Sequence, residues 1–312
     1  MALLYALPGA VAEGLIWGLM AIGVYISYKI LDIADLTVDG SICTGACVCA
    51  VLITGGVPAW LSVLIAFCAG ALTGVCTGLL HTALGIPSIL AGILTQLILY
   101  SVNLAILGGK SLISFVGSQQ TLLLSMSDNI HAILVAGTLI VVTIVVLWLF
   151  FYTEIGLTLK STGDNPDMSR AQGVDVNFNK VLGLALSNGI VAFAGALLAQ
   201  YKGSASINDG RGAIVIGLAA IFIGLSVSLK IKPNFVVSLI GVIGGGIVYY
   251  IIYNFVVLLG LKTDYLKMLS AIIVVLFLAI PYLKNEYFKK QPPLDIQALR
   301  AGQNNGGGGA DA

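Results

Sequence analysis

Charge is scarce in this sequence. Of its 312 residues only 9% are charged, 15 of them Lys or Arg and 14 Asp or Glu, whereas 58% are hydrophobic and the mean hydropathy is +1.03. A soluble protein of this length needs a largely polar shell, which this composition cannot supply. The short alternating segments of an outer-membrane barrel are missing too, because the apolar runs are continuous and about 20 residues long. We therefore expect an all-α polytopic integral membrane protein.

Motifs for catalysis are also absent. The sequence has no GxxxxGKS/T phosphate loop, no GxSxG and no HExxH, and no apolar segment combines carboxylates with His as proton pumps do. We expect no catalytic residue and no cofactor bound by this chain. If the protein moves a solute against a gradient, the energy enters through another component.

Cysteines are few, and all five lie in apolar runs. The spacing of Cys43, Cys47 and Cys49 could suggest a metal or redox site, but no His, Asp or Glu lies between them and a disulfide framework would normally have an even number. We expect no metal site. Small buried residues packing between helices are the favoured interpretation.

Nine apolar segments are candidate membrane spans, and we expect about eight to ten helices. The segments are 11–30, 42–54, 58–80, 86–107, 130–152, 181–200, 213–229, 235–258 and 265–283. Several are shorter than the roughly 20 residues needed to cross a bilayer, which predicts tilted or broken helices. Residues 1–290 form one transmembrane domain in this interpretation. Residues 291–312 are rich in Gly, Pro and polar residues, a composition typical of a disordered tail, which we expect in the cytoplasm.

A weak internal repeat relates two parts of the chain. Six positions between 58 and 85, among them Pro58 and Gly70, carry the same residue 175 positions later. Chance matches in so biased a composition are one explanation. The other is an inverted repeat with broken helices, because the number of intervening spans places the two copies in opposite orientations.

Residues 154–180, which we call the polar island, separate two apolar blocks and contain seven charged residues. Asp164 and Asn165 can cap a helix, Pro166 suits its first position and Gly173 its end. A helix of about two turns is unstable alone in water, so other parts must hold it in place. The island is therefore expected to present a docking surface.

Basic residues in short loops indicate the orientation. Those of the polar island can share one side of the membrane with Lys230, Lys232, Lys284, Lys289 and Lys290. We expect that side, with the C-terminus, to be the cytoplasm. Lys110, Lys202, Arg211 and Lys262 then lie outside, where we expect Arg211 to pair with Asp209.

Polar residues at membrane depth are candidates for a translocation path. Thr37, Asp39 and Ser41 precede or begin a short span, so Asp39 or Ser41 could cap a half-helix facing such a path. An ordinary acidic surface loop is the alternative. Two further pairs could line a cavity or simply form hydrogen bonds between helices: Gln96 with Asn103, seven residues apart on one helix face, and Ser187 with Asn188.

Three stretches resemble the membrane permeases of ABC importers of the branched-chain amino acid and ribose type. They are GLIWGLMAIGVYISYKILDIADLTVDGS (14–41), the island with GDNP (163–166) and RAQGV (170–174), and LGLALSNGIVAFAGALLAQYKGSASINDGRG (182–212). The chain is most similar to the subgroup of amino-acid permeases of uncertain substrate. It departs from the family's usual segment before the second span by its additional Asp39.

The resemblance implies a multi-pass subunit of the bacterial inner membrane that hydrolyses nothing itself. Its expected partners are two cytoplasmic ABC ATPases carrying ATP and Mg, a second permease copy, an extracytoplasmic substrate-binding protein and the lipid bilayer, with no role for nucleic acid. The family's ATPase-docking loop corresponds here to Gly163, Asp164, Asn165, Pro166, Arg170, Ala171 and Gly173.

An aromatic or branched-chain amino acid is the substrate that the resemblance favours. An ABC permease for sugars or nucleosides is the alternative within the same class. A secondary transporter driven by an ion gradient is the alternative from another class, because a broken second span and an inverted repeat would suit it equally.

Overall fold

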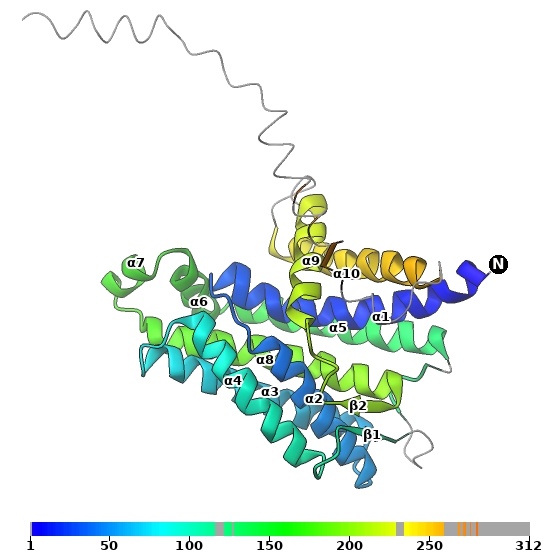
Figure 1. Cartoon of the computed structure of the whole chain (residues 1–312). Coiled ribbons are helices and arrows are strands. Elements are labelled where there is room, and N and C mark those ends of the chain that lie inside the picture. Colours follow the sequence, from blue (N-terminus) through cyan, green and yellow to red (C-terminus); the bar gives the residue numbers. More distant parts are fainter. Residues whose placement is uncertain are drawn as a thin grey trace, which may run out of the picture.

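The computed structural model describes residues 2–115, 122–126, 128–228 and 234–258, with a few isolated positions between 268 and 279. Helices dominate this part of the chain (Figure 1). They are α1 (Ala2–Tyr25), continued by the π-helical η1 (Ile26–Ile30), α2 (Val38–Thr54), α3 (Ala59–Thr82), α4 (Ser88–Ile106), α5 (Asn129–Phe151), α6 (Glu154–Asp164), α7 (Pro166–Ala171), α8 (Val176–Lys202), α9 (Ala213–Ser228) and α10 (Phe235–Leu258). Two short strands, β1 (Leu112–Ser114) and β2 (Ser204–Ser206), pair antiparallel.

The expected polytopic helical membrane protein is confirmed. Six of the described helices are long and apolar enough to cross a membrane, and α2 and α9 are shorter apolar helices. Together these eight helices correspond to the first eight predicted spans. The ninth, 265–283, falls outside the described residues apart from isolated positions, as does the expected tail at 291–312. The small sheet was not expected, because nothing in the local sequence indicates that residues 112–114 and 204–206 meet.

The molecule has two distinct ends (Figure 1). The polar island forms α6, α7 and the start of α8 at one end, and the β1–β2 sheet lies at the other. Lys110, just before β1, and Lys202, just before β2, therefore belong to the end opposite the island. Lys110 and Lys202 thus lie opposite the basic residues of the island, as predicted, whereas the other basic residues of that prediction fall outside the described residues: Lys230, Lys232, Lys262, Lys284, Lys289 and Lys290.

The helices repeat a pattern of long, short, long. In the first copy α1 is followed by the short α2 and the long α3, and in the second α8 is followed by the short α9 and the long α10. α9 begins 175 residues after α2 (213 minus 38), the spacing of the sequence matches. Gly23 of α1 lies against Ser187 of α8, and Leu31 against Gly183, so the two first helices run antiparallel. The helices thus follow the inverted-repeat hypothesis rather than chance similarity.

Glycines bring the two copies into close contact. α3 packs on α8 as α10 packs on α1, each copy's third helix against the other's first. A Cβ on Gly74 would collide with the Leu184 carbonyl oxygen, and one on Gly14 would lie 2.7 Å from the Ile247 Cα. Small residues permit such close approach of helices in membranes, where lipid supplies no hydrophobic drive for association.

The sequence analysis expected all five cysteines to be buried between helices, and for two of them this is wrong. Cys43, Cys47 and Cys49 of α2 are buried, but Cys68 and Cys76 of α3 are exposed. The physical reason is that α3 presents only one face to α8, whereas α2 is enclosed on most sides. All five are free thiols.

Candidate translocation path and docking surface

Two short helices begin at a common junction, joined by Asp39. This residue lies in the first turn of α2, and its Oδ2 and Oδ1 accept the backbone N–H groups of Gly212 and Ile214, each at 2.9 Å. Those N–H groups belong to the start of α9, where the first amides of a helix have no partner within it. The carboxylate of one half-helix therefore caps the other, and its negative charge lies at the positive end of the α9 dipole.

The sequence analysis expected that Asp39 or Ser41 could cap a half-helix, and Asp39 does so, although the capped helix is α9 and not α2, to which Asp39 itself belongs. The N-cap of α2 is Thr37, which makes no side-chain cap bond. Asp39 is already inside the first turn of α2, so its side chain is free to reach the neighbouring chain segment. Asp39 is also not part of an ordinary acidic surface loop, since it is bonded to α9.

A buried hydrogen-bond network holds this junction to α8. Asp35 Oδ1 accepts the Thr37 N–H at 2.9 Å, and Asp35 Oδ2 accepts the Asn188 amide at 2.6 Å. The Ser41 hydroxyl donates to Asn188 Oδ1 at 2.6 Å. The Ser187 hydroxyl donates to the Gly23 carbonyl of α1 at 2.8 Å. Of the two alternatives left open for Ser187 and Asn188, the structure therefore shows hydrogen bonding between helices.

Asp35 lies in the candidate polar stretch before the second span, but the sequence analysis did not assign it to the path. It is 3% exposed and makes no ion pair with any residue that the structure describes. The spacing of Asp35 and Thr37 before a helix is a recognisable signal for an Asp side chain bonded to the backbone two residues on. Its bond to Asn188, 153 residues away, has no local signal.

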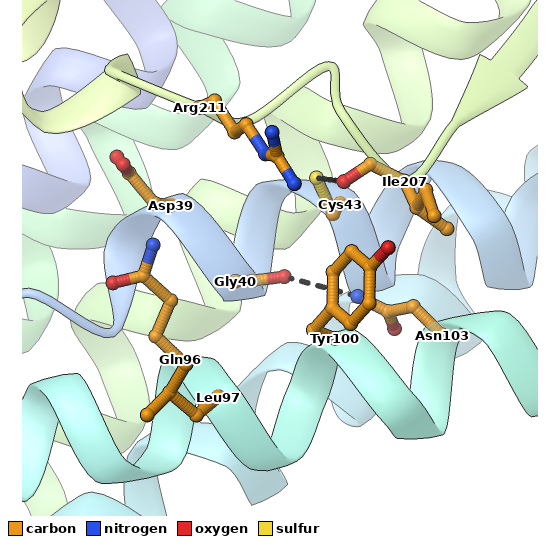
Figure 2. A pocket seen from close by; sticks show the side chains of 9 residues that line it. All are labelled: Asp39, Gly40, Cys43, Gln96, Leu97, Tyr100, Asn103, Ile207 and Arg211. Atoms are coloured by element: carbon orange, nitrogen blue, oxygen red, sulfur yellow. Dashed lines mark hydrogen bonds between the residues drawn. The ribbon is translucent and has the colours of Figure 1, made fainter. Parts of the chain in front are cut away.

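A cavity of about 360 Å³ opens between the N-terminal part of α2, α4 and the segment before α9 (Figure 2). It is lined by Asp39, Gly40, Cys43, Gln96, Leu97, Tyr100, Asn103, Ile207 and Arg211. Of the residues predicted for a path, Asp39, Gln96 and Asn103 meet here. Thr37, Ser41, Ser187 and Asn188 do not line it, and all four are buried.

Asn103 is the most unusual of these residues, because its buried amide is only half satisfied. The residue is 1% exposed, and its Nδ2 reaches the Gly40 carbonyl at a long 3.5 Å. Its Oδ1 has no hydrogen-bond partner among the described residues. An unsatisfied buried acceptor costs about 1–3 kcal/mol, so such groups are uncommon and call for an explanation.

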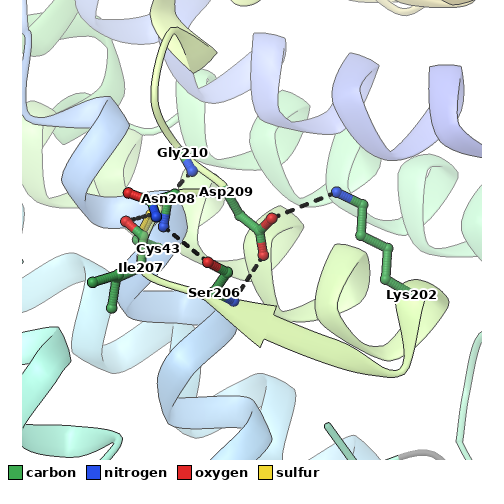
Figure 3. Close-up of polar contacts among 7 residues, drawn as sticks. All are labelled: Cys43, Lys202, Ser206, Ile207, Asn208, Asp209 and Gly210. Carbon is green, nitrogen blue, oxygen red and sulfur yellow. Dashed lines mark hydrogen bonds and ion pairs between the residues drawn. The ribbon is translucent and has the colours of Figure 1, made fainter. Parts of the chain in front are cut away.

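Whereas Asn103 belongs to α4, Arg211 lies in the segment before α9 and contributes a positive charge to the lining of the cavity. Its guanidinium carbon lies 5.9 Å from the centre of the Tyr100 ring (Figure 2), a cation–π contact. The expected pair between Arg211 and Asp209 is not formed. Asp209 instead lies 3.8 Å from Lys202 Nζ and accepts the Ser206 N–H at 2.9 Å (Figure 3). Both partners lie within seven residues of Asp209, and the turn that follows β2, closed by the Asp209 N–H to the Ser206 carbonyl at 3.1 Å, brings Ser206 beside the carboxylate.

Cys43 anchors the segment that carries Arg211. Its Sγ accepts the Gly210 N–H at 3.0 Å and donates to the Ile207 carbonyl at 3.4 Å (Figure 3). The thiol therefore fixes residues 207–210 against α2. The sequence analysis treated Cys43 only as a packing residue and missed this contact, since its partners are more than 160 positions away.

At the opposite end, α7 has the predicted caps. The Asn165 side chain accepts the Met168 N–H at 3.0 Å, Pro166 occupies the first helical position and Gly173 has a φ of +82°. Arg170 and Asp167 form an exposed ion pair at 3.6 Å. Of the predicted docking residues, Asp164, Asn165, Pro166, Arg170, Ala171 and Gly173 are exposed.

Gly163 differs from the other predicted docking residues. It lies against the Ile30 carbonyl at the end of η1, so closely that a side chain there would collide with it. Gly163 thus holds α6 onto the transmembrane helices. α6 itself was not predicted, because the sequence analysis expected one helix in the island rather than two.

Comparisons with known proteins find similarity to permease components of transport systems. The family described as "Branched-chain amino acid transport system / permease component" matches residues 9–278. The tyrosine transport system permease protein of Clostridioides difficile is 37% identical over 86% of this chain and 88% of its own length. An uncharacterized protein of Rickettsia prowazekii is 34% identical over 89% and 97%. The galactose/methyl galactoside import permease protein MglC of Escherichia coli is 26% identical over 73% and 68%. No solved structure matches the chain.

Proposed function

The chain belongs to the family of permease components of branched-chain amino acid transport systems, and from this premise we propose that it imports an amino acid, aromatic or branched-chain. As a member of this family it is the transport subunit of an ABC importer and not an enzyme. The relative that is 37% identical is described as a tyrosine transport permease, which supports an amino-acid cargo. The energy comes from partner ATPases that bind ATP and Mg.

The ATPases dock on α7 in this proposal, two ATPases serving two permease copies. The supporting observation is that this six-residue helix is capped at Asn165, supported from one side and otherwise exposed. Its one buried residue, Ser169, bonds to Ser161 of α6 at 3.3 Å. Met168 is 59% exposed, an apolar side chain at the centre of a polar surface. Apolar residues rimmed by polar ones are typical of protein interaction sites.

The docking assignment sets the orientation. The island end faces the cytoplasm, and the β1–β2 end faces outside, where the substrate-binding protein delivers its cargo. The C-terminus then lies in the cytoplasm of the bacterial cell. The cavity beside Asp39, Gln96 and Asn103 belongs to the translocation path, completed by a second permease copy. Thr37, Ser41, Ser187 and Asn188 support that path by fixing the junction of α2 and α9.

A sugar cargo is the second candidate. The galactose/methyl galactoside permease is 26% identical over 73% of the chain, and amide side chains such as Gln96 and Asn103 suit hydroxyl groups. An ion-driven transporter would also suit the broken helices. Both oxygens of Asp39, however, are already bonded to α9, which leaves that carboxylate little capacity to coordinate a coupling ion.

Purification from native membranes in mild detergent, followed by mass spectrometry, tests the docking assignment. We expect an ATPase to co-purify with the wild type and to be lost from Arg170→Glu and Met168→Glu. Lys110→Glu, a charge reversal at the opposite end, is the matched control and should retain it. Absence of an ATPase from the cross-linked wild type would contradict the proposal. So would uptake that resists vanadate and is abolished by ionophores.

A further inference from the structure

We propose that the cavity between α2, α4 and residues 207–211 is a binding site for one zwitterionic α-amino acid within the permease itself. Arg211 binds its carboxylate, and Asn103 Oδ1 accepts a hydrogen bond from its ammonium. The proposal rests on the proposed function, since it names the substrate class of the same path. It adds that the permease selects its cargo as well as conducting it.

Arg211 has no carboxylate to neutralise it among the described residues. Asp39, which lines the same cavity, accepts the N–H groups of α9, and Asp209, two residues before Arg211, is bonded to Lys202 and Ser206 (Figure 3). Arg211 is exposed and its guanidinium lies over the Tyr100 ring, so the cation is available to a ligand that enters the cavity. Its planar array of donors matches a carboxylate in bidentate geometry. An incoming substrate carboxylate completes the pair that the protein leaves open.

Asn103 offers the complementary acceptor. Its Oδ1 is buried and unpartnered, and the residue lines the same cavity (Figure 2). An ammonium group carries three donors and no acceptor, so it suits this oxygen. Asp39 also lines the cavity, and its negative charge favours a cation on this side. One positive and one negative side chain thus face a ligand that carries both charges.

The remaining lining fits an apolar side chain. Leu97, Tyr100 and Ile207 border the cavity, whose volume of about 360 Å³ lies at the lower end of the range for small-molecule sites. One amino acid with its side chain fits such a space. A neutral sugar would use Gln96 and Tyr100 but has no need of a guanidinium, so Arg211 favours the amino acid.

The position of the cavity connects binding to the repeat. Asp39, Gln96 and Asn103 belong to the first copy, whereas Ile207 and Arg211 belong to the segment that leads into α9 of the second. A ligand held between Asn103 and Arg211 therefore bridges the two copies. Its binding favours whichever arrangement of the two copies brings these groups together.

Equilibrium binding of radiolabelled L-tyrosine to the full-length permease in lipid nanodiscs tests the site. The competitors are tyramine, which lacks the carboxylate, 3-(4-hydroxyphenyl)propionate, which lacks the ammonium, and D-galactose. Wild type should prefer L-tyrosine to each of them. Arg211→Gln should weaken L-tyrosine binding by roughly 10- to 100-fold and leave tyramine unchanged, as expected for loss of a charge-assisted bidentate contact. Arg211→Lys should recover part of the loss.

Two further variants keep the test decisive. Asn103→Leu removes an unsatisfied acceptor, so it should fold at least as well as wild type while losing discrimination against 3-(4-hydroxyphenyl)propionate. Ser206→Ala removes the hydroxyl that accepts the Asn208 N–H in the same segment but changes no charge and no residue lining the cavity, so its preference for L-tyrosine over tyramine should match wild type. A merely structural role for Arg211 predicts that Ser206→Ala and Arg211→Gln behave alike.

The outcomes separate this proposal from the docking assignment. Equal binding of L-tyrosine and tyramine by wild type, or competition by D-galactose alone, would overturn the amino-acid site even if an ATPase co-purifies. Charge-selective binding that depends on Arg211 would uphold it even if no ATPase does.

Discussion

Asp39 joins the two short helices through its two carboxylate oxygens. Each accepts a backbone N–H at the start of α9, and each bond is charge-assisted, which makes it stronger than a bond between neutral groups. The residue therefore fixes the position of Arg211, the residue just before this capped turn. Its structural role and its place at the cavity are consequences of the same contact.

Replacement of Asp39 should destabilise the protein in graded steps. Asp39→Ala leaves two N–H groups of α9 without their acceptor, and loss of a helix cap typically costs about 0.5–2 kcal/mol. Asp39→Asn keeps one acceptor oxygen but loses the charge, so its effect should be smaller. The thermal midpoint of the full chain in detergent, followed by size-exclusion chromatography, measures this order. A midpoint unchanged in Asp39→Ala would mean that the cap contributes nothing.

The sequence predicts individual residues where the signal is local. Gln96 and Asn103 are seven residues apart, so the helical period alone places them on one face, and both line the cavity. The sequence analysis paired Arg211 with Asp209 because the two are neighbours in the sequence. In the structure, Asp209 forms its ion pair with Lys202 instead. Cys43 and Asp35 acquire their roles from partners about 150 positions or more away, for which a single sequence holds no signal.

At the scale of elements, the polar island also combines features that local sequence predicts with features that depend on distant partners. The caps of α7 are predictable because Asn165, Pro166 and Gly173 act on their own backbone. The contact of Gly163 with Ile30 depends on how α6 packs on η1, so it could be recognised only in the structure. Glycines are frequent throughout this chain, and the sequence does not distinguish those at helix contacts from those facing open space.

Two glycines allow a direct comparison between a glycine at a helix contact and one that faces open space. Gly74→Ala places a Cβ against the Leu184 carbonyl and should force α3 away from α8, at a cost of about 1–3 kcal/mol for an overpacked contact. Gly137 of α5 has nothing within 4 Å of such a Cβ. Gly137→Ala should therefore be neutral or stabilising by up to about 1 kcal/mol, the helix propensity gained. Thermal midpoints measure both, and equal shifts would contradict the packing of α3 on α8.

At the scale of the whole molecule, the described residues contain two inverted three-helix units, α1–α3 and α8–α10, in which the third helix of each packs against the first helix of the other. The spacing of 175 residues was present in the sequence, but only as a few matches that chance could explain. The pairing of α1 with α10 and of α3 with α8 is what distinguishes symmetry from chance. The number of spans near the C-terminus stays a prediction, because 265–283 falls outside the described residues apart from isolated positions.

The orientation of the whole molecule is the last prediction, and single cysteines can measure it. If the island end faces the cytoplasm, Met168→Cys should react with a membrane-impermeant maleimide only after cells are permeabilised, since Met168 is exposed on α7. Lys110→Cys, exposed beside β1, should react in intact cells. Both variants are made with Cys68 and Cys76 changed to Ser, because these are the exposed native thiols. That parent gives the background labelling. The reverse pattern would place α7 outside, beyond the reach of any cytoplasmic ATPase, and would contradict the docking assignment as well.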